Sequence, residues 1–181
     1  MKYIVLLRGI NISGKNKISM NELKLELENN KYQNVTTYLN SGNVIFESNI
    51  DDKAVIMKNI REIIKNKFEL EIPVFIMTTF ELEDILCNNP NWWGTNNKEV
   101  YHNLIFIIPP AIYEDVYNTI GEPKENIEKI KEYNNCIFWS YDLKNYRKSN
   151  WWSKTASTDI KDKITIRTAN TMKKILEICK R

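Results

Sequence analysis

Two short, uninterrupted apolar runs constrain the fold of this chain more than any other feature. Residues 3–7 (YIVLL) and 104–108 (LIFII) lie about a hundred residues apart. Successive side chains of a β-strand point to opposite faces of the sheet, so a run that is apolar at every position is typical of a central strand covered on both faces. Each run therefore predicts the middle of a buried sheet rather than its edge.

The segments around the first run follow the order β-α-β-β-α-β. Residues 20–27 carry apolar side chains at helical spacing, and Gly42 lies in a polar turn between two β-rich segments, which predicts a hairpin. Asp51 or Asp52 is a candidate N-cap for the next helix. The predicted elements are a strand at 3–7, a helix from about 20, strands at 35–39 and 44–46, a helix at 56–68 and a strand at 73–77.

The second half repeats this order. A helix through Val116 follows the 104–108 run, and Asn134-Asn135 is a turn candidate between two further strands. The remaining predicted elements are strands at 127–133, 136–141 and 164–167 and a C-terminal helix with Met172, Ile175, Leu176 and Cys179 on one face. The sequence thus predicts an α+β fold of two ferredoxin-like β-α-β-β-α-β halves packed together, plus a C-terminal helix. The predicted division is 1–78, a connector with a short helix at 79–102, and 103–181.

Composition excludes several classes of function. The 26 basic and 23 acidic residues are interspersed and give a net charge of +3, so no charged tail favours nucleic-acid or membrane binding, and a nucleic-acid partner is only weakly supported. No apolar run approaches the roughly 18 residues of a membrane span, and a cytoplasmic protein is expected. The three cysteines are far apart and His102 is the single histidine, which predicts structural thiols and no metal site.

The loop that follows the first apolar run is the strongest candidate site. In a ferredoxin-like unit strands one and three are neighbours, so this loop should lie beside the 40–43 hairpin. Arginine binds oxyanions through a planar fork, lysine adds a point charge, and turn amides can form an anion-binding nest. We therefore predict a binding site for a small anionic ligand; its residues are Arg8, Asn11, Gly14, Lys15, Ser41 and Asn43. The alternative is that the asparagines and glycines only build turns and that Arg8 pairs with a local carboxylate.

The loop also approaches the phosphate-loop pattern G-x-x-x-x-G-K-[ST] at residues 9–16. Asn16 stands where that motif needs a hydroxyl to bind magnesium, and the helix begins too late, near Ser19. A nucleotide hydrolase is therefore disfavoured, whereas simple anion binding is compatible with the same residues.

Three sequence blocks resemble a known family. They are LLRGINISGKN at 6–16, YLNSGNVIF at 38–46 and TIRTANT at 165–171, and they are similar to the bacterial family catalogued as domain of unknown function 1697. The resemblance implies no activity, cofactor or catalytic residue. The chain departs from the family pattern at Ala169, where many members carry an aromatic residue.

Two further groups of residues have more than one interpretation. Lys154, Arg167 and Asn170 are secondary ligand candidates, although Asn170 or Thr171 is better explained as a helix cap. The pairs 92–93 and 151–152 are tryptophans, and packing between subdomains is a better explanation for them than stacking on a base or sugar.

Two classes of function remain open. One is a cytosolic enzyme or binding protein for a small anion, with phosphorylated molecules among the candidates. The other is a non-catalytic regulatory or interaction module that contacts protein or nucleic acid. No acid-base or nucleophile-base pair is evident from the sequence, so the catalytic residues, the reaction and any cofactor stay unassigned.

Overall fold

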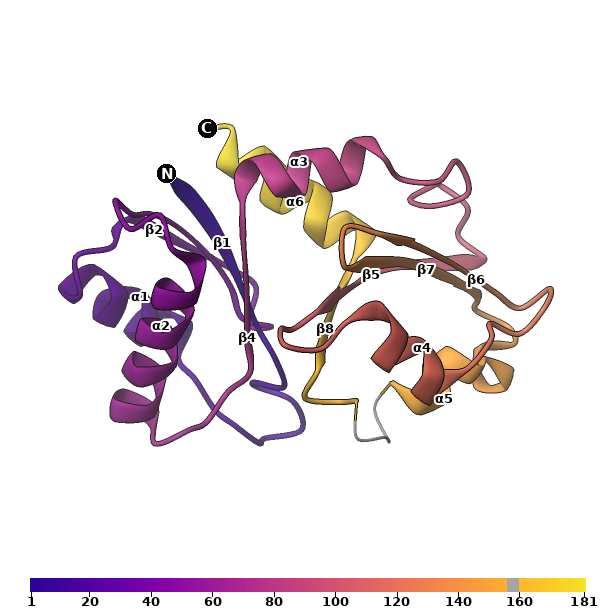
Figure 1. The fold of residues 1–181 in the computed structure, drawn as a ribbon, viewed down its shortest axis with the longest axis horizontal. Helices are drawn as coiled ribbons and strands as arrows, with labels where there is room; N and C mark the ends of the chain where they lie inside the picture. The colour runs from indigo at the N-terminus through magenta and orange to yellow at the C-terminus, as the bar shows by residue number, and fades with distance from the viewer. Residues whose placement is uncertain (156–159) are drawn as a thin grey trace. The chain divides into compact units, whose positions relative to one another are not determined.

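The protein is described by a computed structural model that covers residues 1–155 and 160–181 (Figure 1). The chain forms two compact units: Met1–Leu82 with Cys179–Arg181, and Glu83–Ile178. Each unit contains a four-stranded antiparallel sheet, and the α+β fold predicted from the two apolar runs is confirmed.

The first unit follows the predicted order of elements. Its strand order across the sheet is β2-β3-β1-β4, so the first apolar run is a central strand. The two helices of the β-α-β-β-α-β order cover one face of this sheet (Figure 1). The elements are β1 (Lys2–Leu7), α1 (Met20–Asn29), β2 (Gln33–Tyr38), β3 (Asn43–Glu47), α2 (Lys53–Phe68) and β4 (Val74–Thr78).

Local signals define where the helices of the first unit begin. The Ser19 hydroxyl accepts a hydrogen bond from the Glu22 amide and caps α1. The Asp52 carboxylate accepts from the amides of Ala54 and Val55 and caps α2, so Asp52 rather than Asp51 is the capping residue. These side chains bond amides that have no partner within the helix.

Burial confirms that both faces of β1 are covered. Tyr3, Val5 and Leu7 lie in the core under α1 and α2, and Ile4 and Leu6 on the opposite face are also 0% exposed. The continuous apolar run is thus explained, because a strand with one solvated face would alternate between apolar and polar residues.

The second unit has the same strand order, β6-β7-β5-β8. Helices α4 and α5 cover one face of this sheet and α6 lies on the other side (Figure 1). The chain reaches this unit through α3 (Thr79–Cys87). The other elements are β5 (Val100–Ile107), α4 (Tyr113–Ile120), β6 (Glu128–Tyr133), β7 (Cys136–Asp142), a 3-10 turn at Tyr146–Lys148, α5 (Asn150–Lys154), β8 (Ile164–Thr168) and α6 (Ala169–Cys179).

The predictions for one turn and for one helix cap have different outcomes. Asn134 and Asn135 both adopt left-handed backbone conformations between β6 and β7, as expected for a tight hairpin. The cap of α6 was wrongly assigned to Asn170 or Thr171: α6 begins at Ala169, and the Thr168 hydroxyl accepts from the Thr171 amide. Thr168 precedes the helix, so its hydroxyl reaches an amide of the first turn.

The tryptophan pairs are divided between core and surface. Trp93 and Trp151 are buried, whereas Trp152 is 42% exposed. The Trp93 indole donates to the Asn103 carbonyl and packs edge-on against Phe138 within the second unit. One member of each pair is therefore explained by packing within the second unit, and the prediction of packing between subdomains was wrong for Trp93 and Trp151. None of the described helices is long and apolar enough to cross a membrane.

Candidate functional site

The predicted loop begins between two neighbouring strands of the first unit. The Leu7 amide donates to the Gly42 carbonyl at 2.8 Å, and the Arg8 amide donates to the Pro73 carbonyl at 3.0 Å. Arg8 therefore leaves the sheet beside the β2–β3 hairpin, as the topology predicts. Its side chain is half-buried.

The loop folds back on itself as a small hairpin. The Asn11 amide donates to the Asn16 carbonyl at 3.1 Å, and the Lys15 amide donates to the Ile12 carbonyl at 2.9 Å. Ser13 and Gly14 at the tip have positive φ values of 49° and 77°. Because the Lys15 amide is bonded within the loop, it does not contribute to the predicted anion-binding nest.

Asn11 connects the loop to the β2–β3 hairpin. Its Nδ2 donates to the carbonyls of Ile18 and Asn40, both at 2.9 Å, and its Oδ1 accepts from the Ile18 amide. Both ends of this side-chain amide are thus used to hold backbone. The two polar turns come together as predicted, with Asn11 acting as the bridge between them.

Asn43 and Gly42 shape the hairpin itself. Asn43 is 0% exposed, and its Nδ2 donates to the Tyr38 carbonyl at 2.7 Å and to the Ser41 hydroxyl at 3.1 Å. Gly42 has φ +81°, and a Cβ added there would lie 2.7 Å from the Leu7 Cβ. Asn43 therefore supports the turn from inside and does not present its amide to solvent.

A cavity of about 450 Å³ opens between the loop, Asn40 and the start of α1. Its lining includes Asn11, Gly14, Lys17 and Ser19, and the first residues of α1, Met20 and Asn21. The N-terminus of a helix favours negative charge because its first amides have no intrahelical partner. Arg8, Lys15, Ser41 and Asn43 are not among the residues that line this cavity.

Two lysines supply the positive charge around this cavity. Lys15 and Lys17 are both exposed, and in the described part of the chain neither forms an ion pair. Lys17 lines the cavity, and the Lys15 side chain extends from the same loop. We refer to this cavity and the two lysines as the loop cavity.

The secondary candidates all lie in the second unit, and the side chains of Lys154 and Arg167 form structural contacts there. Lys154 Nζ donates to the Ile120 carbonyl at 2.6 Å at the end of α4. Arg167 is 7% exposed and donates to the Thr165 hydroxyl and the Ile166 carbonyl. Asn170 is exposed in the first turn of α6 and lines a separate cavity of about 350 Å³.

This second cavity is also lined by His102, the single histidine of the chain. His102 Nδ1 lies 2.7 Å from the Ser140 hydroxyl, and Nε2 lies 3.1 Å from the Thr95 hydroxyl. Burial, with a smaller effect from the Lys173 cation, lowers the pKa of His102, so the imidazole is neutral at pH 7. Ser140 stands opposite His102 in the β5–β7 register, a pairing that no local sequence signal specifies.

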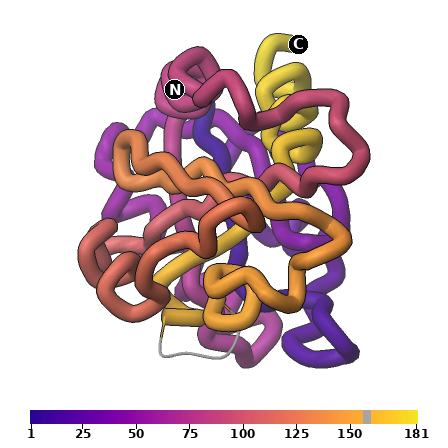
Figure 2. The backbone as a smooth tube through the Cα atoms, turned by 90° about the vertical axis from the view of Figure 1, so that its right-hand side faces the viewer, coloured from indigo at the N-terminus to yellow at the C-terminus, as the bar shows by residue number. Residues whose placement is uncertain are grey.

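The segment before β5 is held beside α6. Figure 2 shows the chain between α3 and β5 running along α6, and Lys173 Nζ donates to the Gly94 carbonyl at 2.7 Å. Thr95 follows Gly94 directly, so this bond positions the Thr95 hydroxyl near His102. No local sequence pattern indicates this contact.

Glu128 is a buried carboxylate that the sequence analysis did not single out. It accepts from the amides of Lys124 and Asn150 at 2.9 and 2.7 Å and from the Trp139 indole at 3.2 Å. The Ser149 hydroxyl also donates to it. Glu128 therefore satisfies the first amides of α5 and ties that helix to β6, which is a structural role.

The residues that the structure describes contain no group of three or more histidine, cysteine, aspartate or glutamate side chains that could hold a metal ion. Cys136 and Cys179 are both buried. Burial raises the pKa of the Cys179 thiol, so a smaller fraction of it is in the reactive thiolate form at neutral pH.

Comparison with known proteins gives a family and a fold without an activity. A family model described as "Protein of unknown function (DUF1697)" matches residues 1–138, and no curated protein matches the chain. The chain is similar to a solved structure described as conserved bacterial protein SP0830 from Streptococcus pneumoniae. The two share 29% sequence identity with a TM-score of 0.86, over 98% of this chain and 97% of the other.

Proposed function

The chain belongs to the DUF1697 family, and we propose that it binds a small anionic ligand, such as a phosphorylated metabolite, at the loop cavity of its first unit. The observation that carries this proposal is the combination of Lys15 and Lys17, which have no ion-pair partner among the described residues, with a cavity at the N-terminus of α1. Positive charge and helix amides both favour an anion.

The residues have different parts in this proposal. Lys17 contacts the ligand from the cavity wall, and Lys15 acts as a nearby point charge. Asn11 holds the loop against the hairpin, and Asn43 holds the hairpin turn. Arg8 and Ser41 lie at the start of the loop and in the hairpin, where they support the site from outside the cavity lining.

The proposed activity is binding, with no chemical step assigned. General acid or base catalysis needs a titratable side chain within hydrogen-bond reach of the reacting group. The described lining of the loop cavity contains lysine, serine and asparagine side chains and no carboxylate, histidine or cysteine. The alternative proposal is the interaction module named above, with protein or nucleic acid as partner.

A thermal-shift screen of the full chain tests the proposal. The probes are inorganic phosphate, sugar phosphates, nucleotides and metabolite carboxylates, each with and without magnesium. A ligand that binds only the folded state raises the melting temperature progressively with its concentration. We expect at least one phosphate-bearing probe to stabilise the protein in this way and to bind more weakly at high salt, because the lysines are solvent-exposed.

Charge-neutral variants locate the site. Lys17→Gln should weaken binding about three- to tenfold, which corresponds to an exposed charge-assisted contact of roughly 1 kcal/mol. Lys129→Gln removes the same charge from an exposed position on β6 and serves as the control. A silent screen, together with self-association or nucleic-acid binding at higher protein concentration, would favour the interaction module instead.

A further inference from the structure

The segment that leads from β7 to the end of α5 combines aromatic and basic residues. Residues 143–154 (LKNYRKSNWWSK) include four basic residues and three aromatic residues, and none is acidic. The segment contains the 3-10 turn and α5, and Figure 1 shows α5 beside α4 on one face of the second sheet. We refer to the side chains of Tyr146, Arg147, Lys148 and Trp152 together as the aromatic-basic surface.

Contacts with the core fix the orientation of α5. Trp151 is 0% exposed, and its indole donates to the Gly121 carbonyl at 3.1 Å. The next residue along a helix points about 100° away, and Trp152 is accordingly 42% exposed. The Trp152 amide donates to the Ser149 hydroxyl at 2.9 Å, which holds the backbone in place. The exposed indole therefore lies on a helical turn that is anchored in the core.

A cation is held beside the exposed indole. The rings of Tyr146 and Trp152 pack edge-on, with their centroids 4.7 Å apart. The central carbon of the Arg147 guanidinium lies 5.6 Å from the centroid of the Tyr146 ring, and Arg147 Nε donates to the Tyr146 hydroxyl at 3.1 Å. Tyr146 thus contacts both the indole and the guanidinium, and the cation-π contact keeps the positive charge near the aromatic pair.

The cations of this surface are not neutralised within the described part of the chain. Lys144 pairs with Glu99 at 2.7 Å. Arg147 and Lys148 are exposed, and neither forms an ion pair with a residue that the structure describes. The buried Glu128 accepts from an amide at the start of α5, so its charge is directed inward. Two positive charges therefore remain available to an anionic partner.

Charge and shape together indicate the class of partner. An exposed aromatic ring offers a face on which a base can stack, and neighbouring cations bind the phosphates of the same strand. A duplex keeps its bases stacked on one another, whereas a single strand can place a base on a protein ring. An acidic peptide supplies negative charge without a planar base, so it would leave the indole unused.

We propose that the aromatic-basic surface binds single-stranded nucleic acid, with one base stacked on Trp152 and with Arg147 and Lys148 bonded to the adjacent phosphates. Stacking of this kind tolerates any sequence, because every base has a π-face. The surface lies in the second unit and shares no residue with the loop cavity. This binding is therefore independent of the small-anion site of the first unit.

Fluorescence anisotropy with the full chain tests this proposal. The probes are fluorescein-labelled oligouridylate and oligothymidylate, a labelled duplex of the same length, and unlabelled polyglutamate as a competitor. We expect saturable binding of the single strands that quenches tryptophan fluorescence and weakens as the salt concentration rises. The duplex should bind more weakly, and polyglutamate should compete poorly, because neither offers a free base to the indole.

Variants of the surface separate stacking from charge. Trp152→Ala should lower the affinity for single strands at least about fivefold and remove most of the quenching, since one stacked base is lost. Trp152→Phe keeps an aromatic ring and should retain most of the affinity. The double variant Arg147→Gln and Lys148→Gln should reduce the slope of log affinity against log salt by roughly 1.4, at about 0.7 for each phosphate contact. This double variant removes no apolar contact, so it tests the proposal even if Trp152→Ala does not fold.

A matched double variant on β6 controls for net charge. Lys129 and Lys131 are exposed, and alternation along the strand places them on the face opposite Ile130, which packs against the core under α4 and α5. Lys129→Gln with Lys131→Gln removes the same charge as the surface double variant. It should leave the affinity and the salt slope close to those of the original chain.

Several results would overturn the proposal. They are the absence of saturable binding to either single strand at low salt, equal affinity in Trp152→Ala and the original chain, equal losses in the surface and β6 double variants, or a preference for the duplex. Efficient competition by polyglutamate would also contradict it, because the surface would then bind any polyanion. Binding that is lost in Lys17→Gln and retained in Trp152→Ala would place the strand at the loop cavity instead.

Discussion

Gly42→Ala is expected to destabilise the first unit strongly, for two separable reasons. The backbone at Gly42 has φ +81°, where a residue with a Cβ incurs a cost of roughly 1–2 kcal/mol. The new Cβ would also lie 2.7 Å from the Leu7 Cβ and 2.9 Å from the Ile10 Cδ1. The Leu7 amide bonds the Gly42 carbonyl, so the strands cannot separate without breaking that bond.

The steric contribution can be separated by comparison with Gly14→Ala. Overpacking a tight site costs roughly 1–3 kcal/mol, which brings the expected total for Gly42→Ala to about 2–5 kcal/mol. Gly14 has φ +77° with nothing within 4 Å of an added Cβ, so Gly14→Ala should have the backbone cost alone. The difference between the two variants therefore measures the contact between the hairpin and β1.

Urea unfolding followed by far-UV circular dichroism is the suitable assay. All five tryptophans lie in the second unit, so tryptophan fluorescence is blind to the first unit's own unfolding. With a urea slope of about 1–3 kcal/mol per molar, a loss of about 3 kcal/mol moves the midpoint by roughly 1–3 M. Equal midpoints for Gly42→Ala and Gly14→Ala would refute the proposed close approach of the hairpin and β1.

Two further predictions concern buried polar groups of the second unit. Because the pKa of His102 is lowered in the folded state, the unfolded state binds more protons below the ordinary histidine pKa of about 6.5. The contribution of His102 to the free energy of unfolding is thus complete above that pH and decreases as the pH falls below it. The urea midpoint of the original chain should therefore fall between pH 8 and pH 5, and His102→Gln should make this fall smaller. An equal fall in both proteins would contradict the lowered pKa of His102. Glu128→Ala leaves the Trp139 indole and the first amides of α5 without their acceptor. Each buried donor left unsatisfied costs about 1–3 kcal/mol, so we expect a total loss of about 2–6 kcal/mol, followed by tryptophan fluorescence. Glu128→Gln keeps an acceptor oxygen and should lose less; equal losses in both variants would contradict this role.

The order of elements could be predicted from the sequence because its causes are local. Apolar periodicity distinguishes strand from helix within a few residues, and it identified the central strands β1 and β5. Short-range chemistry also located a helix start near Ser19 and identified Gly42 as a turn residue. Each of these signals depends on neighbours within about four positions along the chain.

The roles of the polar residues were decided by tertiary structure. Asn11 and Asn43 were predicted as ligand-binding groups, and the folded chain uses their amides to hold the hairpin and the loop. A side-chain amide bonds a backbone carbonyl or a ligand equally well, so its role depends on which group the fold brings within about 3 Å. The loop cavity contains Lys17, which the sequence did not single out.

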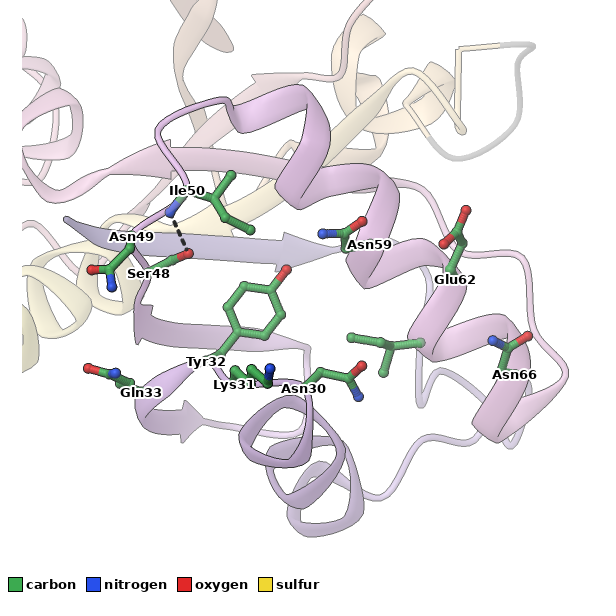
Figure 3. A pocket seen from close by; sticks show the side chains of 11 residues that line it. Asn30, Lys31, Tyr32, Gln33, Ser48, Asn49, Ile50, Asn59, Glu62 and Asn66 are labelled. Carbon is green, nitrogen blue, oxygen red and sulfur yellow. Dashed lines mark hydrogen bonds between the residues drawn. The ribbon is translucent and has the colours of Figure 1, made fainter.

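Contacts across strands and between distant segments could not be predicted from the sequence. His102 contacts Ser140, which is 38 residues away in the sequence, because β5 and β7 pair in one register. A shift of this register by one residue would turn each side chain of the strand to the other face of the sheet. Tyr32 precedes β2 in the sequence, and only the tertiary structure buries its hydroxyl beside Asn59 of α2 (Figure 3). Local patterns determined where the strands and helices of this protein form, whereas the register and the packing of those elements determined which polar groups bond to the backbone and which line a cavity.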